Sequence, residues 1–328
     1  MMTRAAAAPK TIAFAEGSDS RIVEAAVIAL NAGLIKKAHL VGPLADVEAT
    51  LATFDLDDPS GVQVHDPKNS NIFETLAARF VEMRAHKNLS LELAQKATLD
   101  PLIYAALLVE TGRADGSIGG AIATTSDTVR AALQVLGKAK NAPLVSSFFL
   151  MILPENHPLK RPAMVFSDCG MVIDPNAQEL AGIAGQAADS FAALVGDTPK
   201  LGMLSFSTHG SAKHERVTKV QEATEVLKAA RPDLIVDGEL QLDAALVPTV
   251  AASKAPSGAL KGAANVLIFP NLDAGNIGYK LAQRFGGAVA IGPVLQGLAK
   301  PANDLSRGCS AGDVLAMIAV TALQAETA

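Results

Sequence analysis

Three loops in the sequence, each followed by a helix-like run, carry residues that could bind a small polar or anionic ligand. In the first, GSIGGA at residues 116–121 is followed by Thr125, Ser126 and a helix pattern that contains Arg130. A glycine turn before a helix leaves backbone N–H groups and the partial positive charge of the helix N-terminus at one spot, which suits a phosphate. The spacing fits neither a dinucleotide fingerprint nor a P-loop. The segment is therefore either a phosphate site or an ordinary turn in which Thr125 or Ser126 caps the helix.

The second place is SFSTHGSA at residues 205–212, again between a strand-like run and a helix-like run. Its hydroxyl side chains, Ser207, Thr208 and Ser211, could cradle a polar ligand across a cleft. The alternative is that they cap the helix that begins near Lys213.

The third place, NDLSRGCSAGD at residues 303–313, leads into an apolar helix pattern. Ser310 and Asp313 fit the Ser-x-x-Asp form of a capping box, so helix capping alone could account for the carboxylate. Arg307 follows Ser306 in a loop that offers no obvious partner within one turn. An arginine in such a loop can point five N–H donors into a cleft.

The composition excludes several classes of partner. The net charge is -5, tryptophan is absent and only two tyrosines occur, so neither a basic surface nor stacking platforms for nucleic acid are expected. Hydrophobic residues make up 49% of the chain, but no run approaches the roughly 18 to 20 apolar residues of a membrane helix. Residues 1–10 lack the apolar core of a signal peptide.

The cysteines and histidines also favour an ordinary intracellular enzyme. Cys169 and Cys309 form no disulfide framework, which agrees with a reducing compartment. His209 and His214 are five residues apart, on different faces of a helix, so no metal-ligand spacing is found. We therefore expect a cytoplasmic protein without a metal site.

Short strand-like runs alternate with longer helical patterns along the chain, which is typical of parallel sheets covered by helices. Strands are predicted at 11–15, 38–41, 62–65, 116–118, 144–150, 163–166, 201–205, 234–236, 265–269 and 288–291. Helices are predicted at 21–32, 72–84, 101–110, 127–136, 177–194, 213–229, 274–285 and 314–323.

So many strands exceed a comfortable single sheet and favour two doubly wound lobes. Pro143 and the segment 292–301 are the expected crossing points. The predicted fold is α/β, with two α/β/α lobes and mostly parallel sheets. The second lobe (144–296) is inserted in the first (1–143 and 297–328), and an active-site cleft is expected between them.

Four segments resemble those of the phosphate acetyltransferase family: NDLSRG at 303–308, VSSFF at 145–149, DGELQLDAA at 237–245 and SKAP at 253–256. The resemblance runs from about residue 12 to the last helix, and segments of this length in this order are highly specific. It implies the same two-lobed fold, a homodimer, and reversible transfer of an acetyl group between coenzyme A and inorganic phosphate. Coenzyme A is then a substrate, and no metal or organic cofactor is implied.

The resemblance also assigns site residues. Ser306 and Arg307 correspond to the family's active-site serine and arginine, and Asp313 to its catalytic aspartate. Arg84 and Arg130 correspond to two substrate arginines, although on pattern alone both would lie on solvated helix faces. The implied reaction is attack of the coenzyme A thiolate on acetyl phosphate, with Asp313 as general base and Arg307 and Ser306 stabilising the transition state.

Other interpretations remain open at this stage. A related acyltransferase for a longer chain, such as butyryl, would use the same chemistry, because one methylene is worth only about 1 to 3 kcal/mol of discrimination. An acetyl-CoA-sensing domain without activity, as is fused to some malic enzymes, resembles this family throughout. A metal-dependent hydroxy-acid dehydrogenase would need clustered carboxylates, and Asp233, Asp237, Glu239 and Asp243 lack an accompanying nucleotide motif. Ser126 stands where the resemblance leads us to expect alanine, but its neighbours match.

Overall fold

The structure is a computed structural model that describes residues 1–326. Its contacts divide the chain into two compact units. The first unit comprises residues 1–140 and 298–326, and the second comprises Asn141–Gly297. The second unit is thus an insertion in the chain of the first.

The first unit contains a five-stranded sheet in which every neighbouring pair is parallel. Ile12, Ala13 and Phe14 of its central strand are all fully buried. A continuous apolar run of this kind forms a strand that is covered on both faces. In spatial order the strands are β11 (Ala302–Asp304), β4 (Gly116–Gly119), β1 (Lys10–Phe14), β2 (Ile35–Val41) and β3 (Val62–His65).

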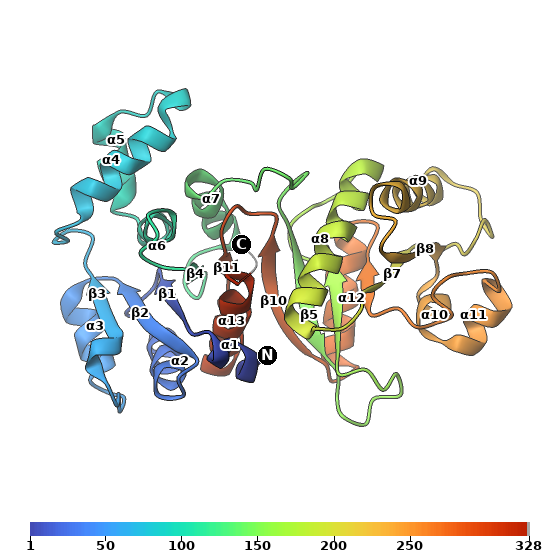
Figure 1. Ribbon diagram of the computed structural model, residues 1–328, viewed down its shortest axis with the longest axis horizontal. Coiled ribbons are helices and arrows are strands. Elements are labelled where there is room, and N and C mark those ends of the chain that lie inside the picture. Colours follow the sequence, from blue (N-terminus) through green and yellow to red (C-terminus); the bar gives the residue numbers. More distant parts are fainter. Residues whose placement is uncertain (327–328) are drawn as a thin grey trace. The chain divides into compact units, whose positions relative to one another are not determined.

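Helices cover both faces of this sheet (Figure 1). The helices of the first unit are α1 (Met2–Ala7), α2 (Ser20–Asn31), α3 (Leu44–Leu51), α4 (Phe73–Met83), α5 (Leu91–Thr98), α6 (Pro101–Glu110), α7 (Thr125–Val135) and α13 (Ala311–Gln324), with short 3₁₀ turns at Pro59–Gly61 and Ala85–Lys87. Helices α2 and α13 pack on each other and on the sheet, and α6 and α7 pack together on its other side. Helix α6 is apolar all round because α4 and α5 cover the side that faces away from the sheet.

The second unit contains a six-stranded mixed sheet. The pairs β10–β5 and β5–β6 are antiparallel, and the remaining pairs are parallel. In spatial order the strands are β10 (Val289–Gln296), β5 (Ser146–Ile152), β6 (Ala163–Ser167), β9 (Val266–Ile268), β7 (Lys200–Leu204) and β8 (Ile235–Leu240).

Alternation along β5 shows how this sheet is covered. Phe149 and Met151 belong to a core that includes Ala244 and packs against Tyr279, so Phe148 and Leu150, which are also buried, face the opposite side. Helices α8 and α9 pack on each other and on the sheet. The helices of this unit are α8 (Ala177–Val195), α9 (Glu215–Ala230), α10 (Leu242–Leu246), α11 (Pro248–Lys254) and α12 (Leu272–Arg284).

The α/β fold class and the mostly parallel sheets are confirmed, whereas several predicted bounds differ from the structure. The strand predicted at 288–291 continues to Gln296, because the ladder passes Pro293 through a register shift between Ile291 and Val294. Asn303 and Asp304, where no strand is predicted, form β11, whose three residues are too short to show a strand period. The strand predicted at 234–236 extends to Leu240. Within residues 1–326 no helix is both long and apolar enough to cross a membrane.

Candidate functional site

The sheet of the first unit brings three loops to one edge. Because its strands are parallel, the segments that follow β1, β4 and β11 leave the sheet at the same edge. From β1 the chain goes first to β2 on one side, and β4 lies on the other. Ligands of open α/β sheets bind at such a switch point, outside the carboxyl ends of the strands.

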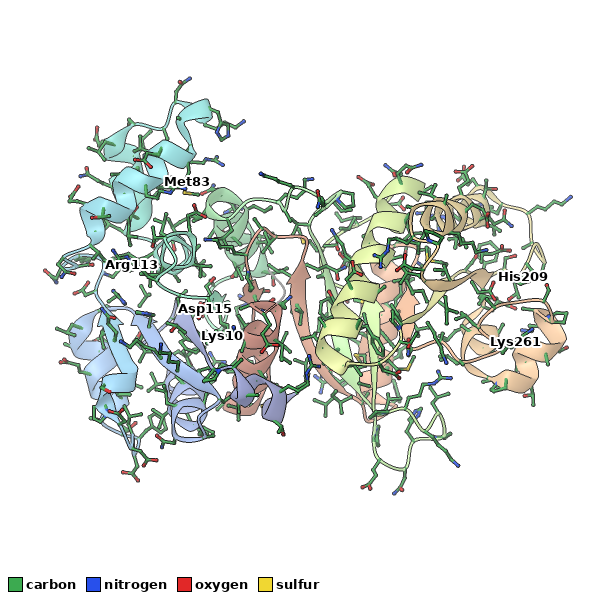
Figure 2. All side chains as sticks on the ribbon, viewed as in Figure 1. Lys10, Met83, Arg113, Asp115, His209 and Lys261 are labelled. Carbon is green, nitrogen blue, oxygen red and sulfur yellow. The ribbon has the colours of Figure 1, made fainter. Side chains whose placement is uncertain are left out.

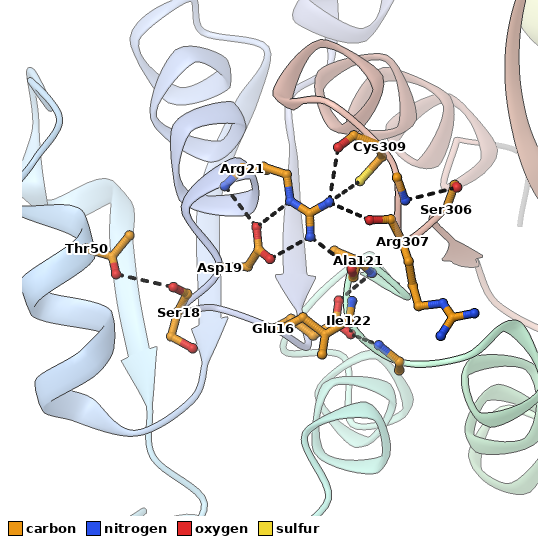
Figure 3. Close-up of polar contacts among 12 residues, drawn as sticks. Glu16, Ser18, Asp19, Arg21, Thr50, Ala121, Ile122, Ser306, Arg307 and Cys309 are labelled. Atoms are coloured by element: carbon orange, nitrogen blue, oxygen red, sulfur yellow. Dashed lines mark hydrogen bonds and ion pairs between the residues drawn. The ribbon is translucent and has the colours of Figure 1, made fainter.

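Glu16, directly after β1, binds the glycine turn that follows β4 (Figure 3). Its carboxylate accepts hydrogen bonds from the backbone N–H groups of Ala121 (2.7 Å), Ile122 (3.0 Å) and Ala123 (2.7 Å). The turn is an anion site, as its sequence indicates, but for these three amides the anion is a side chain of the protein. The expectation that they bind phosphate is therefore wrong for this structure.

Thr124, and not Thr125 or Ser126, caps α7, since its hydroxyl accepts from the N–H of Asp127. The backbone N–H groups of Thr125 and Ser126 make no hydrogen bond within residues 1–326, so the first turn of α7 still presents donors at this edge. The hydroxyl of Thr125 donates to Oδ2 of Asp304 at 2.6 Å.

Asp304, at the end of β11, is buried beneath the glycine turn. A side chain at Gly120 would collide with its Oδ1, which explains why the turn requires glycine there, at φ +97°. Among the described residues, this oxygen is a buried polar atom without a hydrogen-bond partner. Burial raises the pKa of Asp304 to about 6, against the hydrogen bond from Thr125.

Arg21, in the first turn of α2, connects all three loops (Figure 3). It binds Asp19 through two nitrogens, at 3.0 Å and 2.7 Å. It also donates to the backbone carbonyl oxygens of Arg307 (2.8 Å), Cys309 (3.1 Å) and Ala121 (2.9 Å). Its hydrogen bond to Asp19 holds the pKa of that carboxyl below its usual value.

Ser306 and Arg307 lie on the loop after β11, and both are exposed. The hydroxyl of Ser306 accepts from the N–H of Gly308 at 3.3 Å, which closes a tight turn around Arg307. The guanidinium of Arg307 points away from that of Arg21 (Figure 3) and makes no hydrogen bond or ion pair within residues 1–326. The backbone of Arg307 is thus fixed while its charge stays available.

Asp313 forms the predicted capping box at the start of α13. Its Oδ2 accepts from both the N–H and the hydroxyl of Ser310, each at 2.8 Å, and its own N–H donates to the Ser310 hydroxyl. The side chain is exposed, and Oδ1 accepts no hydrogen bond within the described part of the chain. Capping is therefore established, and the role of Asp313 as a base stays a prediction.

The two further arginines of the first unit lie on separate helices. Arg130 pairs with Asp127 at 2.7 Å on the same face of α7, where its side chain is 63% exposed. Arg84 is the C-cap residue of α4 and directly follows Met83, the last residue of the helix (Figure 2). Among residues 1–326 no hydrogen bond or ion pair joins any two of the set Arg84, Arg130, Arg307 and Asp313, so their convergence on one substrate stays a prediction.

In the second unit, the loop after β7 is also closed around a carboxylate. Glu239 of β8 is buried and accepts from the Ser207 hydroxyl (2.8 Å), the Gly210 N–H (2.7 Å) and the Gln221 amide (3.0 Å). Burial acts to raise the pKa of Glu239, but these hydrogen bonds outweigh it and leave the pKa lowered. Ser207, at 0% exposure, is therefore engaged within the protein.

The other hydroxyls of this loop differ in exposure. Thr208 is buried and exchanges hydrogen bonds with Gln241, whereas Ser211 is exposed. None of them caps α9, because that role belongs to His214, whose side chain accepts from the N–H of Arg216. The roles of Ser207, Thr208 and Ser211 in substrate binding stay predictions. No group of three or more histidine, cysteine, aspartate or glutamate side chains within residues 1–326 could hold a metal ion.

Sequence reasoning did not single out Glu16, Arg21 or Asp304. Each lies within a few residues of the end of β1 or β11, so a list of polar residues that follow strands would have included them. Glu16 and Arg21, however, bind backbone groups about a hundred residues or more away, and Asp304 binds the distant Thr125 hydroxyl. No local pattern could have shown those contacts.

Comparison with known proteins identifies the family to which this chain belongs. The family model described as "Phosphate acetyl/butaryl transferase" matches residues 1–322. A phosphate acetyltransferase of Acetivibrio thermocellus is 45% identical over 99% of this chain and 97% of its own length, and one of Paracoccus denitrificans is 46% identical over 98% and 96%. The crystal structure of a phosphotransacetylase from Streptococcus pyogenes, 44% identical, superposes with a TM-score of 0.90 over 98% of this chain and 95% of that one. The chain therefore belongs to the phosphate acetyl/butaryl transferase family.

Proposed function

We propose that this protein is a phosphate acetyltransferase, which converts acetyl-CoA and inorganic phosphate reversibly into acetyl phosphate and coenzyme A. The observation that carries the proposal is the state of Arg307. Arg21 fixes its backbone at the sheet edge through a hydrogen bond to its carbonyl oxygen. Its exposed guanidinium makes no hydrogen bond or ion pair within residues 1–326. Such an arginine suits a phosphoryl oxygen or a developing oxyanion.

In the direction of acetyl-CoA synthesis, the coenzyme A sulfur attacks the carbonyl carbon of acetyl phosphate. The new bond is C–S, the bond that breaks joins the carbonyl carbon to the phosphate oxygen, and phosphate leaves with the electron pair. Arg307 and Ser306 are assigned to the oxygen on which charge grows. The thiol proton passes to Asp313, through the Oδ1 that Ser310 does not engage.

Asp313 cannot make the thiolate alone. Full proton transfer from an ordinary thiol to an ordinary aspartate costs about 6 kcal/mol, since their reference pKa values differ by roughly 4.6 units. A nearby guanidinium offsets part of this cost by stabilising the thiolate and the oxyanion, which is the second role assigned to Arg307.

Phosphate binding is assigned to Arg84, Arg130 and the first turn of α7 with Thr125 and Ser126. The backbone N–H groups of Thr125 and Ser126 are uncommitted within the described chain, and a helix N-terminus attracts anions. Ser211 is assigned to the substrate as the exposed hydroxyl of the 205–212 loop, which Ser207 and Thr208 hold in shape from inside. The reaction is written without a metal or cofactor, and coenzyme A is a substrate.

A longer acyl group is the second candidate, because the matching family model covers both acetyl and longer-chain transferases. The test is to mix purified protein with coenzyme A and acetyl, propionyl or butyryl phosphate, with a chelator present, and to follow thioester absorbance. We expect the highest kcat/KM with acetyl phosphate. A higher value with butyryl phosphate would favour the second candidate, and no thioester with any donor would favour a sensing domain without activity.

We also propose that the protein is a cytoplasmic homodimer. The outer face of α12 supports a dimer: Ile277, Leu281 and Phe285 follow one another at four-residue spacing and are 59%, 50% and 87% exposed. Both cysteines are unpaired, which agrees with a reducing compartment. Sedimentation analysis should give a dimer for the native protein and a monomer for Phe285→Glu, and an unchanged dimer in this variant would exclude the α12 face.

A further inference from the structure

The guanidinium of Arg21 fixes the loop that carries Ser306 and Arg307 at two backbone positions, the carbonyl groups of Arg307 and Cys309. Its Nη1 donates to the carbonyl oxygens of Arg307 and Cys309, at 2.8 Å and 3.1 Å. The first of these peptide groups directly follows Arg307, and the second directly precedes Ser310, the N-cap of α13. Two peptide planes are therefore oriented by a single side chain.

The same guanidinium also holds the neighbouring loop. Its Nη2 donates to the Ala121 carbonyl at 2.9 Å, next to the amides that bind Glu16. Asp19 aims the group with a two-point contact from its own position as N-cap of α2. The segment from Glu16 to Arg21 thus clamps the turn after β4 to the loop after β11.

The loop after β11 has few other restraints of its own. Leu305 donates to the Gly119 carbonyl, while the N–H groups of Gly308 and Cys309 bind only Ser306 within the turn. Local turn bonds fix the shape of the turn but not its position relative to the sheet. The contacts of Arg21 supply that position.

We propose that Arg21 is a positioning residue for acyl transfer: through the carbonyls of Arg307 and Cys309 it sets where the Arg307 guanidinium and the Asp313 carboxylate stand. The inference rests on the proposed function, because it assigns Arg21 to the same reaction. Arg21 does not touch the substrates. A displacement of about 1 Å at reacting groups can lower turnover about 100-fold, so a positioning residue remote from the chemistry can act mainly on kcat.

The experiment measures kcat, the KM of coenzyme A and the melting temperature of Arg21→Met, which keeps the aliphatic stem and removes every donor. We expect kcat to fall about 10- to 100-fold while the KM of coenzyme A changes less than about threefold. Arg21→Lys keeps a positive charge beside Asp19 but cannot bind that carboxylate and three carbonyls together. We expect the lysine variant to lose turnover as well. If Arg21→Met does not fold, the kinetics of Arg21→Lys serve as the test.

Arg161→Met is the matched control. Arg161 also donates to two backbone carbonyls, of Gly262 and Ala264, but in the second unit, to which none of Ser306, Arg307 and Asp313 belongs. We expect this variant to lower the melting temperature and to leave kcat within about twofold of the native value. A merely structural role for Arg21 would give the same pattern in Arg21→Met, and that result would overturn the inference.

A double variant separates this inference from the proposed function. Because Arg21 acts partly through Arg307, the double variant of Arg21→Met and Arg307→Ala should lose less turnover than the product of the two single losses. Multiplicative losses, with Arg307→Ala itself strongly impaired, would overturn the positioning role and leave the proposed function standing. Native turnover in Arg307→Ala would overturn both.

Discussion

Ser310 donates two hydrogen bonds to one carboxylate oxygen of Asp313, from its N–H and from its hydroxyl, both at 2.8 Å. The other oxygen accepts none within the described residues. The two oxygens can therefore serve two purposes, since one caps α13 and the other is available to a proton. This arrangement makes the structural and catalytic roles of Asp313 separable by experiment.

Ser310→Ala should cost about 0.5 to 2 kcal/mol of unfolding free energy and leave most of the turnover, because the cap is lost while the carboxylate remains. Asp313→Asn should lose turnover by about 10² to 10⁴, since an amide cannot accept the thiol proton. Denaturant unfolding and steady-state kinetics on both variants test this. If Asp313→Asn loses stability but keeps kcat, Asp313 is a cap only.

Arg84→Ala and Arg130→Ala should raise the KM of phosphate and acetyl phosphate with smaller effects on kcat, if both side chains bind phosphate equally in the ground and transition states. The ion pair of Arg130 with Asp127 is exposed, so its loss should change stability by less than about 1 kcal/mol. Arg79→Ala is the control, because Arg79 lies on α4 but is occupied by Glu82 and Glu110. An unchanged KM in the first two variants would remove them from the site.

A buried histidine pair predicts a loss of stability in mild acid. Nδ1 of His39 lies 2.7 Å from Nε2 of His65, so one ring must accept a hydrogen bond from the other. Burial lowers the pKa of both to about 4, helped by Lys37 and Arg113 for His39 and by His39 and Arg113 for His65. An unfolded histidine titrates near 6.5, so between pH 6.5 and 4 the unfolded chain binds more protons.

The contribution of this pair is therefore complete above about pH 6.5 and is lost as the pH falls toward 4, by an amount on the order of 3 kcal/mol for each ring. Urea unfolding across this range measures it. Replacement of both rings in H39L/H65L should flatten this part of the profile. A native profile in that double variant would show that other groups cause the acid sensitivity.

The effect of Asp304 on the pH dependence of stability is opposite in sign to that of the histidine pair. Its pKa of about 6 lies above the ordinary aspartate value of 3.8, so its contribution to stability is present below pH 4 and is lost as the pH rises through 6. Asp304→Asn is neutral throughout, so its unfolding free energy relative to the native protein should increase from pH 4 to pH 7. A constant difference over that range would mean that Asp304 is ionised in the fold at all of these pH values.

The sequence was sufficient for elements with a clear period or cap. The helix predicted at 101–110 is α6, introduced by the Asp100 cap and Pro101, and the Ser-x-x-Asp pattern is the capping box of α13. Only part of the chemistry of the loops could be predicted from the sequence. The turns at 116–121 and 205–212 donate hydrogen bonds to two carboxylates of the protein, Glu16 and Glu239, and the local sequence could not reveal these partners.

The VSSFF segment at 145–149 also makes contacts that its local sequence could not reveal. Its Ser147 donates from both its N–H and its hydroxyl to Asp168, whose carboxylate also accepts from Gly170, Met171 and Val172. In each case the partners are distant in sequence or depend on a turn that only the fold creates. The local sequence shows that a position requires a small residue or a hydrogen-bond donor. Tertiary contacts determine which group that residue or donor faces.

The most direct test of the account is the turnover number of Arg307→Ala in thioester formation from acetyl phosphate and coenzyme A. The guanidinium makes no hydrogen bond or ion pair within residues 1–326, so its removal should change the unfolding free energy little. We predict that kcat falls about 10² to 10³-fold, the usual effect of losing a donor to a developing oxyanion. A kcat equal to that of the native protein, in a variant that is fully folded, would contradict the account.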